Sequence, residues 1–210
     1  MDSEVIVNLI ARSKAETQVE RIADAARQIE GAFSLVITTN DSLVGVRDPQ
    51  GFRPLCLGKT ANGYVLSSES CALDAIKAEF IRHIDPGEMV IIDDSGVRSV
   101  IYAEPEKIDK KLCVFEYIYF ARGDSHIDGQ SVYQSRLNMG RELYNETKYD
   151  ADIVMSIPDS GTTAALGYAR ASGIPFAEGL VKNRYSGRTF IKPNQEEREL
   201  AVRMLSLIHI

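Results

Sequence analysis

The sequence comprises 210 residues, of which 44% are hydrophobic and 26% charged, and its formal net charge is −6 at pH 7. This composition is typical of a globular protein, and the length suffices for one large domain or two small ones. The acidic balance argues against nucleic acid as a partner, because phosphate backbones are bound by basic surfaces. No apolar run reaches the roughly 18 residues of a membrane span, so membrane insertion is not expected either.

The N-terminus and the cysteines indicate a reducing compartment. The segment MDSEVIVNLI lacks the basic, apolar and small-residue regions of a secretory signal. Cys56, Cys71 and Cys113 lie far apart without a CxxC pair, which is typical of free thiols. We therefore expect a cytoplasmic protein in which Cys56 and Cys71 are core residues.

The first half predicts two helices followed by strands. Asp2 is placed to cap a helix with its apolar residues on one face, and residues 19–29 give a second helical stripe. The segment RDPQGFRPL is expected to be a loop, because its prolines and glycine interrupt regular structure. Strands are expected at residues 32–38, 43–46, 54–57, 64–67, 89–93 and 97–102, with a short helix at 72–78. Helices followed by mainly antiparallel strands predict a layered α+β domain.

The pattern changes after about residue 111. An apolar stripe from Val132 to Leu143 predicts a helix, and residues 153–157 predict a short apolar strand. The loop PDSG, a helix at 162–171, the stop signal Gly173 and a strand at 174–181 complete a βαβ unit, which builds a parallel sheet. We place the domain boundary between residues 103 and 115.

Two loops of this βαβ unit are candidates for binding an anion. In IPDSGTTAALGYA a strand leads through a tight turn into a helix N-terminus, where free N–H groups and the helix dipole attract phosphate. In KNRYSGRTFI three basic residues surround a tyrosine directly after a strand. Both loops would lie at the carboxyl ends of parallel strands, where such sheets bind ligands. Taken alone, the first segment also fits an ordinary helix cap and the second a solvated basic loop.

These segments carry a family resemblance. KNRYSGRTFIKPNQ, IPDSGTTAALGYA and CVFEYIYFARGDSHIDG, with GAFSLVI, RDPQGFRPLCLGK, SSESCALDAI and IDPGEMVII before them, resemble the amidophosphoribosyltransferases over residues 2 to about 204. These are the glutamine phosphoribosylpyrophosphate amidotransferases that open de novo purine synthesis. The resemblance implies an α+β and α/β chain: part of an Ntn-type glutaminase layer domain at 1–110, part of a type I phosphoribosyltransferase parallel sheet at 111–204, and an atypical tail at 205–210.

The resemblance also implies roles for individual residues. Asp2 matches the aspartate that holds the α-amino group of substrate glutamine. Matches to the phosphoribosylpyrophosphate-binding loops are Asp159, Ser160 and Gly161 in the pyrophosphate loop and Lys182, Arg184, Tyr185 and Arg188 in the loop that closes over it. Mg²⁺ is the implied cofactor, although some members have a metal-contacting serine at the position of Gly161. Cys113 matches one of four cysteine ligands of a 4Fe–4S cluster in some members, but members without a cluster also carry cysteine there, and a small buried apolar residue is the preferred interpretation.

Other parts of the family pattern have no match. The nucleophilic N-terminal cysteine of the glutaminase and the aspartate-rich loop that cradles ribose 5-phosphate are absent from the 210 residues. We therefore expect an internal fragment with no glutaminase activity of its own, cut from an enzyme that makes 5-phosphoribosylamine from glutamine and phosphoribosylpyrophosphate. The implied parent is a homo-oligomer with purine nucleotides as regulators. The alternative is a non-catalytic phosphate-binding or assembly module; a glutaminase for another acceptor is disfavoured by KNRYSGRTFI.

Overall fold

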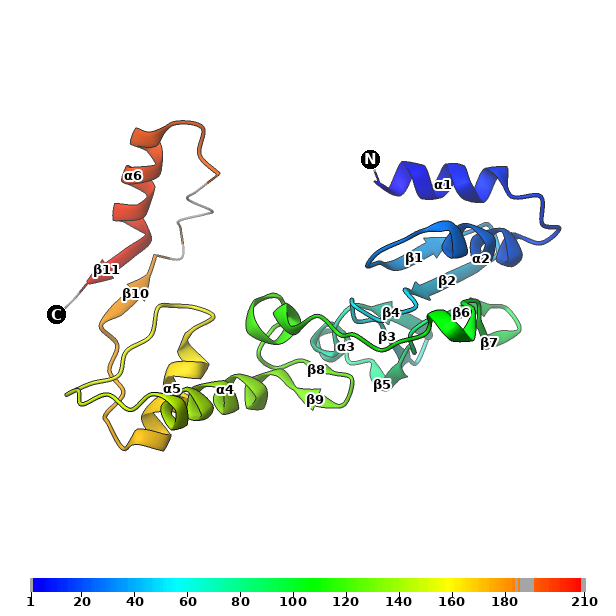
Figure 1. Ribbon diagram of the computed structural model, residues 1–210. Helices are drawn as coiled ribbons and strands as arrows, with labels where there is room; N and C mark the ends of the chain where they lie inside the picture. Colours follow the sequence, from blue (N-terminus) through cyan, green and yellow to red (C-terminus); the bar gives the residue numbers. More distant parts are fainter. Residues whose placement is uncertain (1, 184, 186–190, 209–210) are drawn as a thin grey trace. The chain divides into compact units, whose positions relative to one another are not determined.

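The structure, a computed structural model, describes residues 2–183, 185 and 191–208. Contacts divide the chain into two compact units, Met1–Ser131 and Val132–Ile210, whose helices and strands are labelled in Figure 1. Both units combine helices with strands, which confirms the mixed α/β class predicted from the sequence. None of the helices in the described part of the chain is long and apolar enough to cross a membrane.

The two N-terminal helices form where the sequence predicts them. Helix α1 spans Asp2–Arg12 and helix α2 spans Gln18–Gln28. Thr17 and Glu20 form a reciprocal capping box at the start of α2, which satisfies two backbone N–H groups there. One face of α2 is buried, and its Ile22 is only 1% exposed. The apolar stripe of the sequence is therefore the core-facing side of this helix.

A four-stranded antiparallel sheet lies beneath α2 in the order β1-β2-β6-β7. Its strands are β1 (Ser34–Thr38), β2 (Ser42–Arg47), β6 (Glu88–Asp93) and β7 (Gly96–Ile101). Met89 and Ile91 of β6 pack in the core cluster that contains Ile22. Val90, between them, belongs to a second cluster with Leu55 and Leu57. Because successive residues of a strand point to opposite faces, this sheet is covered on both sides.

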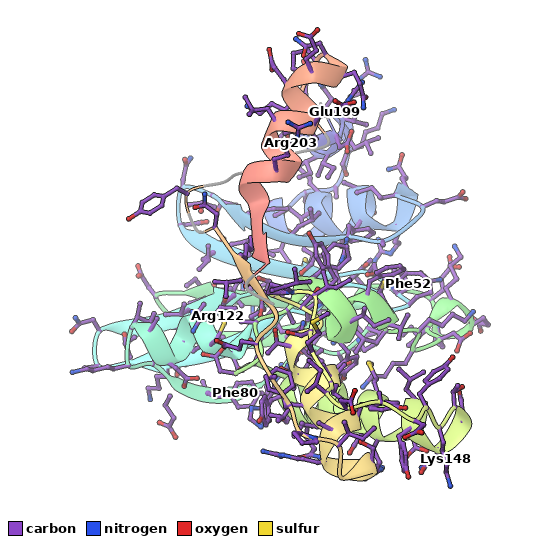
Figure 2. All side chains as sticks on the ribbon, turned by 90° about the vertical axis from the view of Figure 1, so that its left-hand side faces the viewer. Phe52, Phe80, Arg122, Lys148, Glu199 and Arg203 are labelled. Atoms are coloured by element: carbon purple, nitrogen blue, oxygen red, sulfur yellow. The ribbon has the colours of Figure 1, made fainter. Side chains whose placement is uncertain are left out.

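The second cluster joins this sheet to a three-stranded antiparallel sheet of order β4-β3-β5. Its elements are β3 (Cys56–Thr60), β4 (Gly63–Ser67) and β5 (Glu79–His83), with the short helix α3 (Ser70–Ala75) between the last two. Strand β5 is not predicted from the sequence. Its residues Phe80, labelled in Figure 2, and Ile81 stay more than 40% exposed, so no buried alternation marks the strand. The unit thus consists of a helix layer and two antiparallel sheets.

The segment RDPQGFRPL is a loop, as predicted, and a buried arginine holds it. The Arg47 guanidinium donates to the carbonyl oxygens of Gly51, Arg53 and Ile84 at 2.6–2.9 Å. It also makes a two-pronged ion pair with Asp128, with both N···O distances 3.1 Å. Both side chains are buried, being 1% and 7% exposed. Arg47 therefore connects the loop, the end of β5 and the 126–131 hairpin.

Residues 111–131 pack with the first unit. The backbone N–H of Lys111 donates to the carbonyl oxygen of Gln50 at 2.7 Å, and the N–H of Cys113 donates to the carbonyl oxygen of Phe52 at 3.3 Å. The segment contains elements that the sequence does not predict: the π-helix η2 (Glu116–Phe120) and a hairpin of β8 (His126–Ile127) and β9 (Gln130–Ser131), after the 3₁₀ turn η1 (Pro105–Lys107). The family-derived domain limits at residues 110 and 204 stay a prediction.

The second unit is built on two closely packed helices, α4 (Val132–Glu146) and α5 (Thr162–Ser172). Glycines allow the approach: a Cβ on Gly140 would lie 1.8 Å from the carbonyl oxygen of Ala164. A Cβ on Gly167 would lie 2.1 Å from that of Leu137. Figure 1 shows the two helices side by side, and Figure 2 marks Lys148 just beyond the end of α4. Gly173, at φ 76°, ends α5 as predicted.

The predicted parallel sheet is reduced in this unit. Residues 153–157 and 174–181 form a single parallel bridge, Val154 to Phe176, with β10 confined to Leu180–Lys182. The parallel direction is thus confirmed, whereas the predicted full strands are wrong. Ile153, Met155 and Ile157 are 42–78% exposed, so the apolar run lacks a covering layer among the described residues. Two further elements follow that the sequence does not predict. Helix α6 (Gln195–Leu205) leads into β11 (Ser206–Ile208), which pairs antiparallel with β10.

Candidate anion-binding site

The predicted anion loop forms a tight turn at the start of α5. The Thr162 N–H donates to the carbonyl oxygen of Asp159 at 3.2 Å, and the Ala165 N–H donates to the carbonyl oxygen of Gly161 at 2.9 Å. A Cβ on Gly161 would lie 2.8 Å from the Ile157 carbonyl oxygen, so only glycine fits this turn without a shift. The peptide bond between Pro158 and Asp159 is cis.

Free backbone donors gather at this turn. In the described parts of the chain the N–H groups of Ser160, Gly161 and Thr163 have no hydrogen-bond acceptor. The side chain of Ser160 is exposed, whereas Gly161 and Thr163 are half-buried. Unpaired N–H groups at the positive end of a helix dipole are the usual components of a phosphate site. The turn thus presents the donors that the sequence predicts.

Lys182 brings positive charge to the same turn. It is the last residue of β10, and its Nζ lies 2.9 Å from Oδ2 of Asp159. The two side chains are 39% and 74% exposed. The structure therefore brings together two of the predicted binding residues that are 23 positions apart in the sequence.

The other predicted phosphate ligands are less defined. Tyr185 is fully exposed, and its N–H donates to Oδ1 of Asn183 at 3.0 Å. Arg184 and Arg188 lie outside the described residues. Asp2, the predicted glutamine ligand, is exposed in the first turn of α1 in the other unit.

Ser156 makes a contact with Thr162 that the sequence does not predict. It is 9% exposed, and its hydroxyl lies 3.1 Å from the Thr162 hydroxyl. The bond ties the apolar segment 153–157 to the first residue of α5, and so fixes the entry into the turn. The available signal was a single polar residue within an apolar run.

The cysteines occupy two kinds of environment. Cys56 is 0% exposed, and burial, with Cys71 nearby, raises the pKa of its thiol to about 11. Cys56 and Cys71 are core residues, as predicted. Cys113 is half-buried, and all three thiols are free. No group of three or more histidine, cysteine, aspartate or glutamate side chains placed to hold a metal ion occurs among the described residues.

Comparisons with known proteins relate the first part of the chain to the glutamine amidotransferases. Residues 1–75 match a family model described as a glutamine amidotransferase domain. The particular family follows from relatives named amidophosphoribosyltransferase: that of Methanocaldococcus jannaschii is 49% identical over 97% of this chain and 46% of its own length. That of Synechococcus elongatus is 52% identical over 97% of this chain and 42% of its own length.

A solved structure of an enzyme of this kind also matches the chain. The glutamine phosphoribosylpyrophosphate amidotransferase from B. subtilis, complexed with ADP and GMP, matches with a TM-score of 0.90 and 43% identity over 99% of this chain and 45% of that one. The chain is therefore homologous to the amidophosphoribosyltransferases along almost all of its length, as its motifs indicate. It spans less than half the length of these relatives.

Proposed function

We propose that the chain is part of a glutamine-dependent amidophosphoribosyltransferase. In this reaction glutamine and water give glutamate and ammonia; ammonia then displaces pyrophosphate from C1 of phosphoribosylpyrophosphate and gives 5-phosphoribosylamine. The supporting evidence is the homology to enzymes of that name over 97% of the chain. This identity favours an enzyme over a non-catalytic binding or assembly module.

The anion site at the start of α5 carries the transferase part of the proposal. Pyrophosphate is the leaving group, and its negative charge increases as the bond to C1 breaks. The free N–H groups of Ser160 and Gly161, with the Lys182 ammonium, would hold this charge, and so favour the transition state. In the proposal Arg184, Tyr185 and Arg188 close over the bound ligand.

The glutaminase part rests on Asp2. A carboxylate in the first turn of α1 is suited to the α-ammonium group of a glutamine substrate. No residue of this sequence is assigned as the nucleophile, since none matches the N-terminal cysteine of the family. The glutaminase layer and the type I phosphoribosyltransferase sheet remain the proposed architecture.

Metal groups have no fitted site among the described residues. Four cysteines normally hold a 4Fe–4S cluster, and the sequence contains three. The one described carboxylate in the anion loop, that of Asp159, is bound to Lys182. We therefore assign no step to a cluster or to Mg²⁺, and the cluster role of Cys113 stays a prediction.

Regulation and assembly extend the proposal. The B. subtilis relative was solved with ADP and GMP, and we infer purine nucleotides as regulators and a homo-oligomer as the assembled form. Three free thiols suit a reducing compartment such as the cytoplasm.

Titration with pyrophosphate and phosphoribosylpyrophosphate tests the site in the 210-residue chain. We expect a Kd on the order of millimolar, because exposed charge pairs each contribute roughly 1 kcal/mol or less. The backbone N–H signals of residues 160–163 should shift in NMR spectra. Lys182→Ala and Arg184→Ala should weaken binding.

Arg98→Ala is the matched control, because Arg98 lies on β7 and pairs with Asp93 in the other unit. Binding should also weaken as salt is added, since exposed charges are screened. Equal losses from Lys182→Ala and Arg98→Ala, or unmoved signals at residues 160–163, would show that the turn is only a helix cap.

A further inference from the structure

The ion pair between Asp159 and Lys182 places a carboxylate inside the proposed anion site. The Lys182 ammonium contacts Asp159 Oδ2 at 2.9 Å. The Asp159 carbonyl oxygen accepts the Thr162 N–H, so this aspartate lies within one turn of the start of α5. Negative side chains are stabilised at this end of a helix, as phosphates are. The carboxylate therefore uses the same charges that an incoming phosphate would use.

We propose that Asp159 is a competing anion built into the site, which holds Lys182 in the free protein and releases it when a pyrophosphate-bearing ligand binds. The inference rests on the proposed function in one respect, that this turn binds such a ligand. It assigns Asp159 a role different from that of a direct phosphate ligand. A carboxylate has no donor for a phosphate oxygen at neutral pH, whereas Ser160, Gly161 and Lys182 all have donors.

The sign of the effect follows from the charges. Bound pyrophosphate must displace the carboxylate from Lys182 and must also tolerate a second negative charge nearby. Both effects weaken binding, and substituting asparagine removes both while preserving the shape of the side chain. Because the two side chains are 39% and 74% exposed, solvent screens their interaction strongly. We therefore expect Asp159→Asn to bind pyrophosphate about two- to fivefold more tightly than the original chain.

A set of matched variants tests this, with pyrophosphate as the probe and EDTA present to exclude metal ions. Asp159→Asn should tighten binding, Lys182→Ala should weaken it, and Asp159→Glu should stay near the original affinity. In the Lys182→Ala background, Asp159→Asn should increase the affinity for pyrophosphate less, because only the repulsion between carboxylate and ligand remains to be removed. The gain from Asp159→Asn should shrink as salt is added. In free Asp159→Asn the ¹⁵Nζ signal of Lys182 should move toward that of an unpaired, solvated lysine, because the ion pair is lost.

The outcomes separate this inference from the proposed function. Failure of every variant to bind pyrophosphate would overturn the proposed function and the competition with it. Binding that Asp159→Asn leaves unchanged or weakens would overturn the competition alone. Repeating the titration with Mg²⁺ adds one more outcome: loss of Mg²⁺-dependent binding in Asp159→Asn would assign the carboxylate to the metal and likewise overturn the competition.

Discussion

Arg47 has the largest fully buried side chain among the described residues. Its guanidinium makes hydrogen bonds to three carbonyl oxygens and to both carboxylate oxygens of Asp128. A buried charge is stable only where its donors and partner charge are satisfied, and this one satisfies both conditions. The arrangement ties a proline- and glycine-rich loop to the rest of the first unit.

Replacing Arg47 by methionine should destabilise the protein by about 3–5 kcal/mol, because the buried Asp128 loses its main partner and three carbonyls lose their donor. Urea denaturation, followed by a signal from the first unit, measures this. Arg98→Met is the matched control: its pair with Asp93 lies at the surface, where solvent screens it, so its loss should change stability little. Similar losses from the two substitutions would show that Arg47 does not have this role.

His83 predicts a pH dependence of stability. Its Nδ1 is buried without a partner in the described structure, and burial lowers its pKa, although the nearby Asp128 raises it in part. Arg47, Lys110 and His126 also act on it, each lowering the pKa. Below pH about 6.5 the unfolded chain therefore binds a proton that the folded chain does not. The free energy of unfolding should fall as the pH is lowered from about 6.5 towards 5.

Denaturation at several pH values checks this expectation. His83→Gln should flatten the dependence in that window, while His126→Gln should only reduce it slightly, because His126 makes the smallest of the contributions that lower the His83 pKa. An unfolding free energy that rises as the pH falls from 6.5 would contradict the sign of the His83 pKa shift.

At the scale of elements, the buried helices and strands are the ones that the sequence predicts. Helix α2 has a clear apolar stripe, and the strands β2 and β6 are runs of buried residues that pack on both faces of their sheet, so the sequence predicts the positions of all three. Strand β5 was missed because its first three residues are exposed. A full strand at 153–157 is predicted but not found, because an apolar sequence indicates a preference for burial and does not indicate a partner strand.

The candidate site divides in the same way. Local pattern located the turn before α5 and the basic segment after β10. The Asp159–Lys182 contact could not be predicted, because it depends on how residues 23 positions apart are brought together. The contact of the Ser156 hydroxyl with Thr162, six residues further on, follows no helix or strand period, so the only sign of it in the sequence is a polar residue within an apolar run.

The packing of α4 on α5 gives a prediction for one element pair. Gly140→Ala places a Cβ 1.8 Å from the Ala164 carbonyl oxygen, which is backbone and cannot move aside alone. The helices must separate, so we expect a loss of roughly 1–3 kcal/mol or more. Denaturant unfolding measures it, with Glu142→Ala on the exposed face of α4 as the control. A Gly140→Ala chain as stable as the control would show that the helices do not approach so closely.

At the scale of the whole molecule, the two units differ in how much core they contain. The first unit has three apolar clusters, which include Val44, Val90 and Leu73, each 0% exposed. In the described part of the second unit few apolar side chains are buried, chiefly Val132, Leu137 and Ala169. Ile157 and Leu200 are 78% and 59% exposed. Since apolar burial is the main stabilising contribution to folding, the second unit should be the less stable.

Hydrogen exchange should reveal this difference directly. Segments of a protein open with their own free energies, and those with few buried apolar contacts open first. We expect the N–H groups of α4 and α5 to exchange faster than those of β2 and β6 under native conditions. Gly140→Ala should speed exchange in α4 and α5 and leave β2 and β6 unchanged, whereas Arg47→Met should act on the first unit. Equal protection in both units, or a Gly140→Ala effect that spreads to β2 and β6, would show that the chain opens as one cooperative unit.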